Sequence, residues 1–396
     1  MTPEQRAWFD EPVDRSGTNS LKWDVMDGEL PLWVADMDFR TAPAITQAIE
    51  KRAAHAIYGY SIIPDEWNAA YVDWWGSRHH LALEPEWLAF ANGVMPIMSS
   101  CVRKLTTPAE NVVVQTPVYN IFFNSIVDNG RNMVENPLVY DRATGRYSVD
   151  FEDLERKLAD PQTTMMFLCN PHNPVGAIWN EDTLRRIGQL CLQYGVTVVE
   201  DSIHCDITDP GYEYVPLLSV DPEFTRNTIM CVAPTKAFNM AGLQTACAVV
   251  PDPLLRHKVR QALHTDGISE PNAFAVQATV AAFREGADWL DAMREYVADN
   301  RALVREFLAE HLPLIRLIPS HATYVLWLDC ADMMPQLEPG QSLGDDLRAT
   351  TGLFLTNGAQ YGGASDAFLR MNIACPQSTL REALAALERY FKAVRL

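Results

Sequence analysis

The stretch "MMFLCNPHNPVGAIWNEDTLRRIGQLCLQYGVTVVED", residues 165–201, decides the fold class of this chain. It starts with an apolar strand that runs into a loop rich in Asn and Pro, over 165–174. A helical pattern follows over 180–195 and ends on Gly195, and a second strand covers 196–201. Strands that alternate with helices predict a mostly parallel α/β sheet with helices on both faces. Further strand-like runs lie at 111–117, 227–234 and 245–251.

The pattern changes near residue 285, where a long amphipathic helix begins with "DWLDAMREYVADNRALVREFLAEHL". The segments "TYVLWLD" and "FLRMNIACP" and a final helix then predict a smaller α+β domain. We therefore expect an N-terminal arm over 1–45 that joins the small domain, a large domain over 46–285 and the small domain over 286–396. A chain of 396 residues is long enough for two such units.

Composition limits the classes of partner. The chain carries 51 acidic and 32 basic residues, a formal charge of −19. General binding to nucleic acid or to anionic lipid requires a basic surface, so neither partner is expected. A small anionic ligand in a local basic pocket remains compatible with this charge.

The eight cysteines form no CxxC pair, and several lie inside apolar strand-like runs. Their spacing favours neither a zinc site nor a disulfide framework, so no metal is expected. Reduced thiols indicate the cytoplasm. The N-terminal residues "MTPEQRAWFDEPVDR" show no signal pattern, and no apolar run approaches the length of a membrane span.

Three predicted strand ends carry polar side chains. Asn173 lies in "NPHNPVG", Asp201 and His204 in "VVEDSIHCD", and Lys236 in "APTK". In open parallel sheets, ligand-binding groups gather beyond the carboxyl ends of the strands. A desolvated lysine suits Schiff-base chemistry with an aldehyde. Taken alone, Lys236 is better interpreted as a lysine that extends from a strand end into water, and only the three strand ends together favour the chemical interpretation.

Four motifs, "NPHNPVG", "ED-I-H", "TKAFN-AGL" and "LRMNIA", occur in the order and spacing of a known family. The chain resembles the pyridoxal-phosphate-dependent aminotransferase class I/II family of fold type I, over most of its length. The resemblance implies a seven-stranded-type sheet and pyridoxal 5'-phosphate as cofactor.

By this resemblance Lys236 carries the cofactor as a Schiff base and later takes the Cα proton. Asp201 faces the pyridine nitrogen, and Asn173 hydrogen-bonds the phenolic oxygen and borders the substrate. Ile203 packs beneath the ring and His204 lies near the phenolic oxygen, although a core position is an equally good interpretation of both.

Tyr119, in "TPVYNIFF", is expected to stack on the ring. The segment "ANGVMPIMSS" resembles the phosphate cradle of the family, which assigns Gly93, Val94 and Met95, with an ordinary helix start as the alternative. Thr235 adds a hydroxyl to the phosphate, whereas Ala233 stands where many relatives have serine.

The substrate carboxylate is assigned to Arg370, because a guanidinium binds a carboxylate through two parallel bonds. The backbone at Ala35 and Asp36, in "WVADMDF", is expected to close the same pocket. Tyr60 resembles the tyrosine that reaches the phosphate of the neighbouring subunit and could assist catalysis, as could Tyr119. The assignment implies a homodimer with active sites at the interface, and Tyr58 is the alternative to Tyr60.

The segments "KWD", "LWVADMDF", "YGYS", "ATYVLWLD" and "SIHCD" narrow the resemblance to the MalY/PatB group of cystathionine β-lyases and carbon–sulfur lyases. Most aminotransferases of the wider family have an arginine eight residues after the lysine, where this chain has Gln244. The implied reaction cleaves the Cβ–S bond of cystathionine or cysteine S-conjugates to a thiol, pyruvate and ammonia. The alternatives are an aminotransferase on the same scaffold and a regulatory role in protein interaction.

Overall fold

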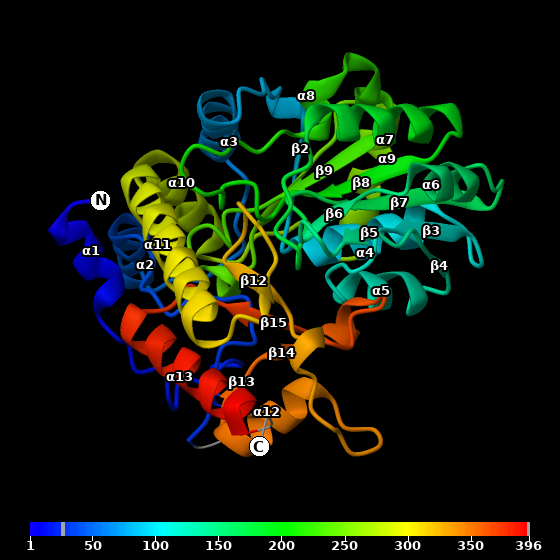
Figure 1. Ribbon diagram of the computed structural model, residues 1–396. Coiled ribbons are helices and arrows are strands. Elements are labelled where there is room, and N and C mark those ends of the chain that lie inside the picture. Colours follow the sequence, from blue (N-terminus) through cyan, green and yellow to red (C-terminus); the bar gives the residue numbers. More distant parts are fainter. Residues whose placement is uncertain (25–27, 394–396) are drawn as a thin grey trace.

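A seven-stranded sheet forms the centre of the larger part of the structure (Figure 1), a computed structural model that describes residues 1–24 and 28–393. Six strands run in one direction, and β10 alone is antiparallel to both of its neighbours. The predicted mostly parallel sheet is thus confirmed. In spatial order the strands are β2 (Leu88–Ala91), β10 (Ala246–Val249), β9 (Thr228–Val232), β8 (Thr197–Asp201), β7 (Thr163–Cys169), β3 (Asn111–Val114) and β4 (Asn132–Glu135).

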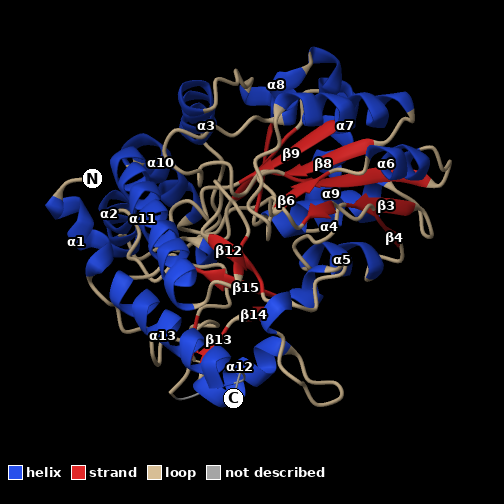
Figure 2. Cartoon of the chain, viewed as in Figure 1, coloured by secondary structure: helices blue, strands red, loops and turns tan. Residues whose placement is uncertain are grey.

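Helices cover both faces of this sheet, as Figure 2 shows by the blue ribbons around the red strands. The local signals for α7 (Glu181–Gln193) are clear in the sequence. The Asn180 side chain accepts a hydrogen bond from the N–H of Thr183 at 2.8 Å and caps the helix, and Gly195 follows its end at φ +68°. One face carries α4 (Val94–Leu105), α5 (Ile121–Val127) and α9 (Pro253–Thr265), and the other carries α6 (Phe151–Leu158), α7 and α8 (Leu217–Val220).

A second, antiparallel sheet of four strands lies in the C-terminal part of the chain. Its central pair, β12 with β15, is buried throughout. The strands are β11 (Arg316–Leu317), β12 (Val325–Asp329), β15 (Phe368–Asn372) and β14 (Thr356–Asn357), and the accompanying helices are α11 (Ala287–His311), α12 (Leu343–Thr351) and α13 (Gln377–Ala393).

The N-terminal residues contact this second part directly. Helix α1 (Pro3–Asp10) packs against α11 and places Phe9 in the core, and β1 (Leu30–Pro31) pairs in parallel with β13 (Leu353–Phe354). The predicted domain boundaries themselves stay a prediction. The remaining elements are the helices α2 (Pro43–Ala54), α3 (Asp65–Arg78) and α10 (Ala275–Glu285), which pack together, and the hairpin of β5 (Val139–Asp141) and β6 (Arg146–Ser148).

All eight cysteines lie in the described ranges, and each is buried as a free thiol. Burial raises the pKa of the Cys101 and Cys191 thiols to about 12, so both stay protonated and behave as small apolar side chains. Among residues 1–24 and 28–393, none of the helices combines the length and the apolar character needed to cross a bilayer.

Candidate active site

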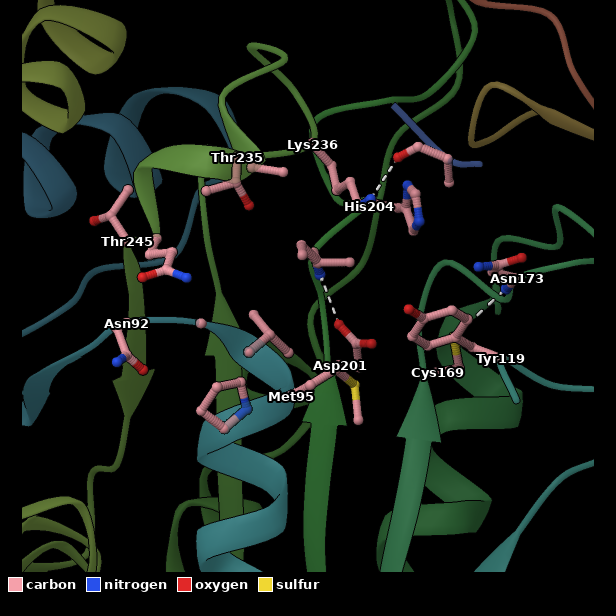
Figure 3. A pocket seen from close by; sticks show the side chains of 17 residues that line it. Asn92, Met95, Tyr119, Cys169, Asn173, Asp201, His204, Thr235, Lys236 and Thr245 are labelled. Atoms are coloured by element: carbon pink, nitrogen blue, oxygen red, sulfur yellow. Dashed lines mark hydrogen bonds between the residues drawn. The ribbon is translucent and has the colours of Figure 1, made fainter. Parts of the chain in front are cut away.

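A cavity of about 190 Å³ opens at the carboxyl ends of β7, β8 and β9, where the sequence predicts a site (Figure 3). Asp201 is the last residue of β8, while Asn173 and Lys236 lie in the loops after β7 and β9. The structure brings together eleven of the predicted site residues in the lining: Ala35, Gly93, Val94, Met95, Tyr119, Asn173, Asp201, Ile203, His204, Thr235 and Lys236.

Lys236 extends into this cavity and donates a hydrogen bond from Nζ to the carbonyl oxygen of Ala35. Burial lowers the pKa of the Lys236 amine from 10.5 to about 8, because the charged form loses its water. The carboxylate of Asp36 opposes this shift, and the Arg370 guanidinium adds to it. The site therefore holds an amine that can lose its proton near neutral pH.

Asp201 is a buried carboxylic acid at the floor of the cavity. Burial raises its pKa to about 6, although the N–H of Ile203 donates to Oδ1 at 3.1 Å and Lys236 lies near, which both favour the charged form. A cation placed against this side chain would lower the pKa of Asp201 and favour the charged carboxylate. Asp201 is suited to hold a protonated ring nitrogen.

His204 lies beside Lys236 in Figure 3, and its imidazole is almost fully buried. Burial, with the nearby Lys236 and Arg370 charges, lowers the pKa of His204 to about 3, so the ring is neutral. Among residues 1–24 and 28–393 its Nδ1 has no hydrogen-bond partner, and its ring centroid lies 5.9 Å from that of Tyr324 in an edge-on arrangement. An unpartnered buried nitrogen in a cavity indicates a place for a further hydrogen-bonding group.

Arg370, on β15, reaches the same rim from the second sheet. Its Nη1 donates to Oδ1 of Asn173 at 3.3 Å, and its Nη2 donates to the carbonyl oxygen of Trp33 at 2.7 Å. The Nε of Arg370 is buried and has no partner in the described part of the chain, and the Tyr361 ring centroid lies 5.0 Å from the guanidinium. Burial raises the pKa of the Tyr119 phenol, an effect that the Arg370 guanidinium reduces. A guanidinium held in this way still has donors available for a carboxylate.

The opposite end of the cavity is suited to an anion. Helix α4 begins at Val94 with Gly93 as its N-cap, and glycine has no side chain to cap it, so the first amides of the helix remain available. Thr235 lines the same end, and Ala233 is buried beneath it. Gln244 lies at the rim, exposed and in the left-handed conformation at φ 50°.

These groups fit pyridoxal phosphate by the chemistry of the donor set. An amine, a buried carboxylic acid and a helix N-terminus face one cavity, as the aldehyde, the ring nitrogen and the phosphate of that cofactor require. The unpartnered Nδ1 of His204 adds a polar atom for the ring substituents.

Four predicted residues lie outside the cavity lining: Arg370, which contacts the lining residue Asn173, and Tyr60, Tyr58 and Asp36. Tyr60 is fully exposed on the described chain, and Tyr58 donates its hydroxyl to the carbonyl oxygen of Ala53 at 3.0 Å. The side chain of Asp36 points to Arg15, 2.8 Å away, while its carbonyl oxygen accepts a bond from Asn372. The assignment of Tyr60 to a neighbouring subunit stays a prediction.

The sequence did not identify several residues that support the site. Asn239 bonds the backbone of Met37 and Phe39, Asn372 bonds the carbonyl oxygens of Val34 and Asp36, and Asp38 binds Lys22. Asn239 and Asn372 are the last polar letters of "TKAFN" and "LRMN", which was a usable signal.

Comparison with protein families identifies the sequence model of "Aminotransferase class I and II", which matches residues 29–387. Cystathionine beta-lyase PatB of Bacillus subtilis is 39% identical over 96% of this chain and 98% of that protein. Protein MalY of Escherichia coli is 31% identical over 98% of this chain and 99% of that protein.

Among solved structures, cystalysin from Treponema denticola, which contains a pyridoxal 5'-phosphate cofactor, superposes with a TM-score of 0.91. It is 28% identical, and the match covers 97% of this chain and 98% of that chain. Fold and sequence therefore point to the same group of proteins.

Proposed function

The chain belongs to the aminotransferase class I and II family, and we propose that it is a pyridoxal-phosphate-dependent carbon–sulfur β-lyase of the cystathionine β-lyase type. One observation carries this proposal. The similarity to cystathionine beta-lyase PatB extends over 96% of the chain and includes the segments that build the cavity. The reaction would convert cystathionine or a cysteine S-conjugate and water into a thiol, pyruvate and ammonia.

Five side chains would hold the cofactor and the substrate. Lys236 would bind the aldehyde carbon, Asp201 would keep a proton on the pyridine nitrogen, and Asn173 would donate to the phenolic oxygen. Tyr119 would cover the ring face, and Arg370 would bind the α-carboxylate of the substrate. Bound pyridoxal phosphate supplies an electron sink that stabilises negative charge at Cα.

The proposed reaction then has two parts: a proton is removed from Cα, and the thiol group leaves from Cβ. Lys236, whose pKa is lowered to about 8, takes the proton from Cα as a general base near neutral pH. Arg370 fixes the carboxylate, and its contact with Asn173 keeps the substrate at the cofactor end of the cavity. The thiol leaves from Cβ, and water completes the conversion to pyruvate and ammonia.

Gln244 supports a lyase over an aminotransferase on this scaffold. By the resemblance of its motifs, it stands where most aminotransferases of the wider family have an arginine, and it lies at the cavity rim. Because Gln244 is a neutral amide, the end of the cavity that is suited to an anion has one cation fewer than it would have with an arginine.

We also propose a homodimer, in which Tyr60 of each chain completes the site of the other. Tyr60 and the neighbouring apolar residues Ile57, Tyr58 and Ile62 are exposed on the described chain, which a second copy could cover. The buried free thiols favour a reducing compartment, and we place the enzyme in the cytoplasm.

The test combines purified protein, pyridoxal phosphate and cystathionine, followed by assays for pyruvate and free thiol in equal amounts. The Lys236→Ala variant is the matched control and should form neither product. Failure of the wild type on cystathionine and on a set of cysteine S-conjugates would exclude the lyase. Formation of pyridoxamine phosphate together with a keto acid, without free thiol, would identify an aminotransferase instead.

A further inference from the structure

A cluster of four charged side chains, two of them buried and two partly exposed, lies behind the active-site cavity. We call Arg15, Lys22, Asp36 and Asp38 the charge cluster. Lys22 Nζ lies 2.7 Å from Asp38 Oδ2, and Arg15 binds Asp38 and Asp36, each at 2.8 Å. The Trp23 indole also donates to Asp38 at 2.8 Å. The Lys22 side chain is 0% exposed and that of Asp38 is 4% exposed, so both charges are withdrawn from water.

Two members of the charge cluster, Asp36 and Asp38, belong to a short segment, residues 33–38, which we call the pocket wall. The wall separates the active-site cavity of about 190 Å³, which Ala35 lines, from an outer cavity of about 300 Å³, which Asp36, Met37 and Asp38 line. Met37 packs in the hydrophobic core, but open space borders Ala35 on one side and Asp36 on the other, so the position of the segment also depends on polar contacts.

The pocket wall presents its carbonyl oxygens to the two main site residues. The carbonyl of Ala35 accepts from Lys236, and the carbonyl of Trp33 accepts from Arg370 at 2.7 Å. Asn372, two residues after Arg370, donates to the carbonyls of Val34 and Asp36 at 2.7 and 2.6 Å. A displacement of the wall would therefore shift the partners of Lys236 and Arg370 together.

Stability alone is a poor reason for such a cluster. Each buried charge loses several kcal/mol of hydration, and replacing a buried ion pair by apolar residues of similar volume is often neutral. Unlike apolar packing, the ion pairs hold these side chains in one defined geometry. The two positive and two negative charges also balance, so the cluster carries no net charge.

We propose that Lys22 and Asp38 are positioning residues, which hold the pocket wall where its carbonyls orient Lys236 and Arg370. The inference rests on the proposed function for the roles of these two residues, but the placement of the wall can be measured without it.

The main test is the double variant Lys22→Met/Asp38→Asn, which removes one charge of each sign and leaves the Arg15–Asp36 pair. The matched control is Arg40→Met/Glu11→Gln, which removes an ion pair that is 62% and 64% exposed in the same region. Amide hydrogen exchange of the full chain without cofactor reports on the wall, and steady-state kinetics of the loaded enzyme report on the site.

In the double variant we expect amides of residues 33–38 to exchange at least about tenfold faster. KM should rise about tenfold, because the wall orients Arg370 for the carboxylate, and kcat should fall about threefold or more, because the wall also orients the Lys236 amine. The exposed control should match the wild type in both measurements. Trp23→Phe is a milder change that removes one donor to Asp38. It should raise both the amide exchange rate of residues 33–38 and KM by about threefold.

Unchanged exchange at residues 33–38 in a folded double variant would overturn the proposal. Faster exchange with an unchanged KM would also overturn it, since the wall would then not act on the site. A double variant that fails to fold leaves the decision to Trp23→Phe under the same two criteria. If the wild type lacks lyase activity, the proposed function fails, while hydrogen exchange still decides whether the charge cluster positions the wall.

Discussion

Arg370 Nη1 lies 3.3 Å from Asn173 Oδ1, although 197 residues separate the two in the sequence. The contact joins β15 of the antiparallel sheet to the loop after β7 of the parallel sheet. The proposed carboxylate site and the proposed cofactor site therefore meet across the boundary between the two sheets. Changes to either residue should act on substrate binding.

Replacing Arg370 by lysine should weaken substrate binding. A lysine keeps the charge but loses the planar fork, and hydrogen bonds to charged groups contribute about 1.5–3 kcal/mol each. We expect KM to rise roughly 10- to 100-fold with kcat within a few-fold, measured by pyruvate release. Arg316→Lys, at an exposed position on β11, is the control. An unchanged KM in Arg370→Lys would contradict the carboxylate assignment.

Removing the Lys236 amine should abolish turnover. Loss of a positioned general base costs about 10²–10⁴-fold, and loss of the covalent attachment adds to this. Lys236→Ala should also lack the visible absorbance of the loaded wild type, while Lys258→Ala, an exposed lysine on α9, keeps both. Visible absorbance that persists in Lys236→Ala would mean that another residue carries the cofactor.

The Lys236 amine should titrate near pH 8 in the chain without cofactor, because burial lowers its pKa from 10.5 to about 8. Since the unfolded chain holds this proton up to about pH 10.5, the contribution of Lys236 to stability should increase from pH 8 to 10.5. Asp36 raises this pKa, so Asp36→Asn should lower it further. The measurement is pH-dependent acylation of Lys236, read by mass spectrometry.

The control for this titration is Asp128→Asn, which neutralises an exposed carboxylate at the end of α5. It should leave the labelling midpoint of Lys236 unchanged. A midpoint near 10.5 in the wild type would show that the amine is hydrated and not poised for proton transfer.

Gly93→Ala should weaken cofactor binding. A Cβ at this position would lie 3.0 Å from Cδ and 3.2 Å from Cγ of Pro96, so the start of α4 must shift. We expect the Kd for pyridoxal phosphate to rise about tenfold, equivalent to 1.4 kcal/mol, in a fluorescence titration. Gly76→Ala on α3, where a Cβ meets open space, is the control. Equal affinities of Gly93→Ala and the wild type for pyridoxal phosphate would show that the phosphate does not bind at the N-terminus of α4.

Two defective variants should complement each other if Tyr60 acts across a dimer. Lys236→Ala and Tyr60→Phe are each expected to show reduced activity alone. Refolding them together at equal amounts should restore about a quarter of the wild-type sites, because half of the dimers are hybrids with one intact site. Activity no higher than the average of the two parents would place Tyr60 outside the neighbouring site.

The sequence allowed prediction of the sheet and of the residues at its strand ends. Asn173, Asp201 and Lys236 each follow an apolar run, and the carboxyl ends of parallel strands meet at one edge. Local periodicity and a general packing rule were therefore enough to place these three residues together.

The contacts that orient these residues were not predictable in the same way. Asn372 and Asp36 bond across 336 residues, and no periodic pattern encodes such a pairing. The degree of burial of each lysine was also not predictable from the sequence. Lys236 stands out because it lies in an apolar stretch, but the lysine whose side chain is 0% exposed is Lys22. Tertiary contacts decide both features, and a single sequence does not contain them in readable form.

The pairing of β1 with β13 has a consequence for biosynthesis. Residues 30–31 leave the ribosome long before residues 353–354 exist, and Asn372, which holds the pocket wall, is made later still. The parallel sheet can assemble around Lys236 during translation, and Lys22 and Asn239 can already contact the wall, but the contacts of the wall with Asn372 form only after nearly the whole chain has been made. A nascent chain can therefore acquire its cofactor pocket early, yet it becomes competent for substrate only after synthesis ends.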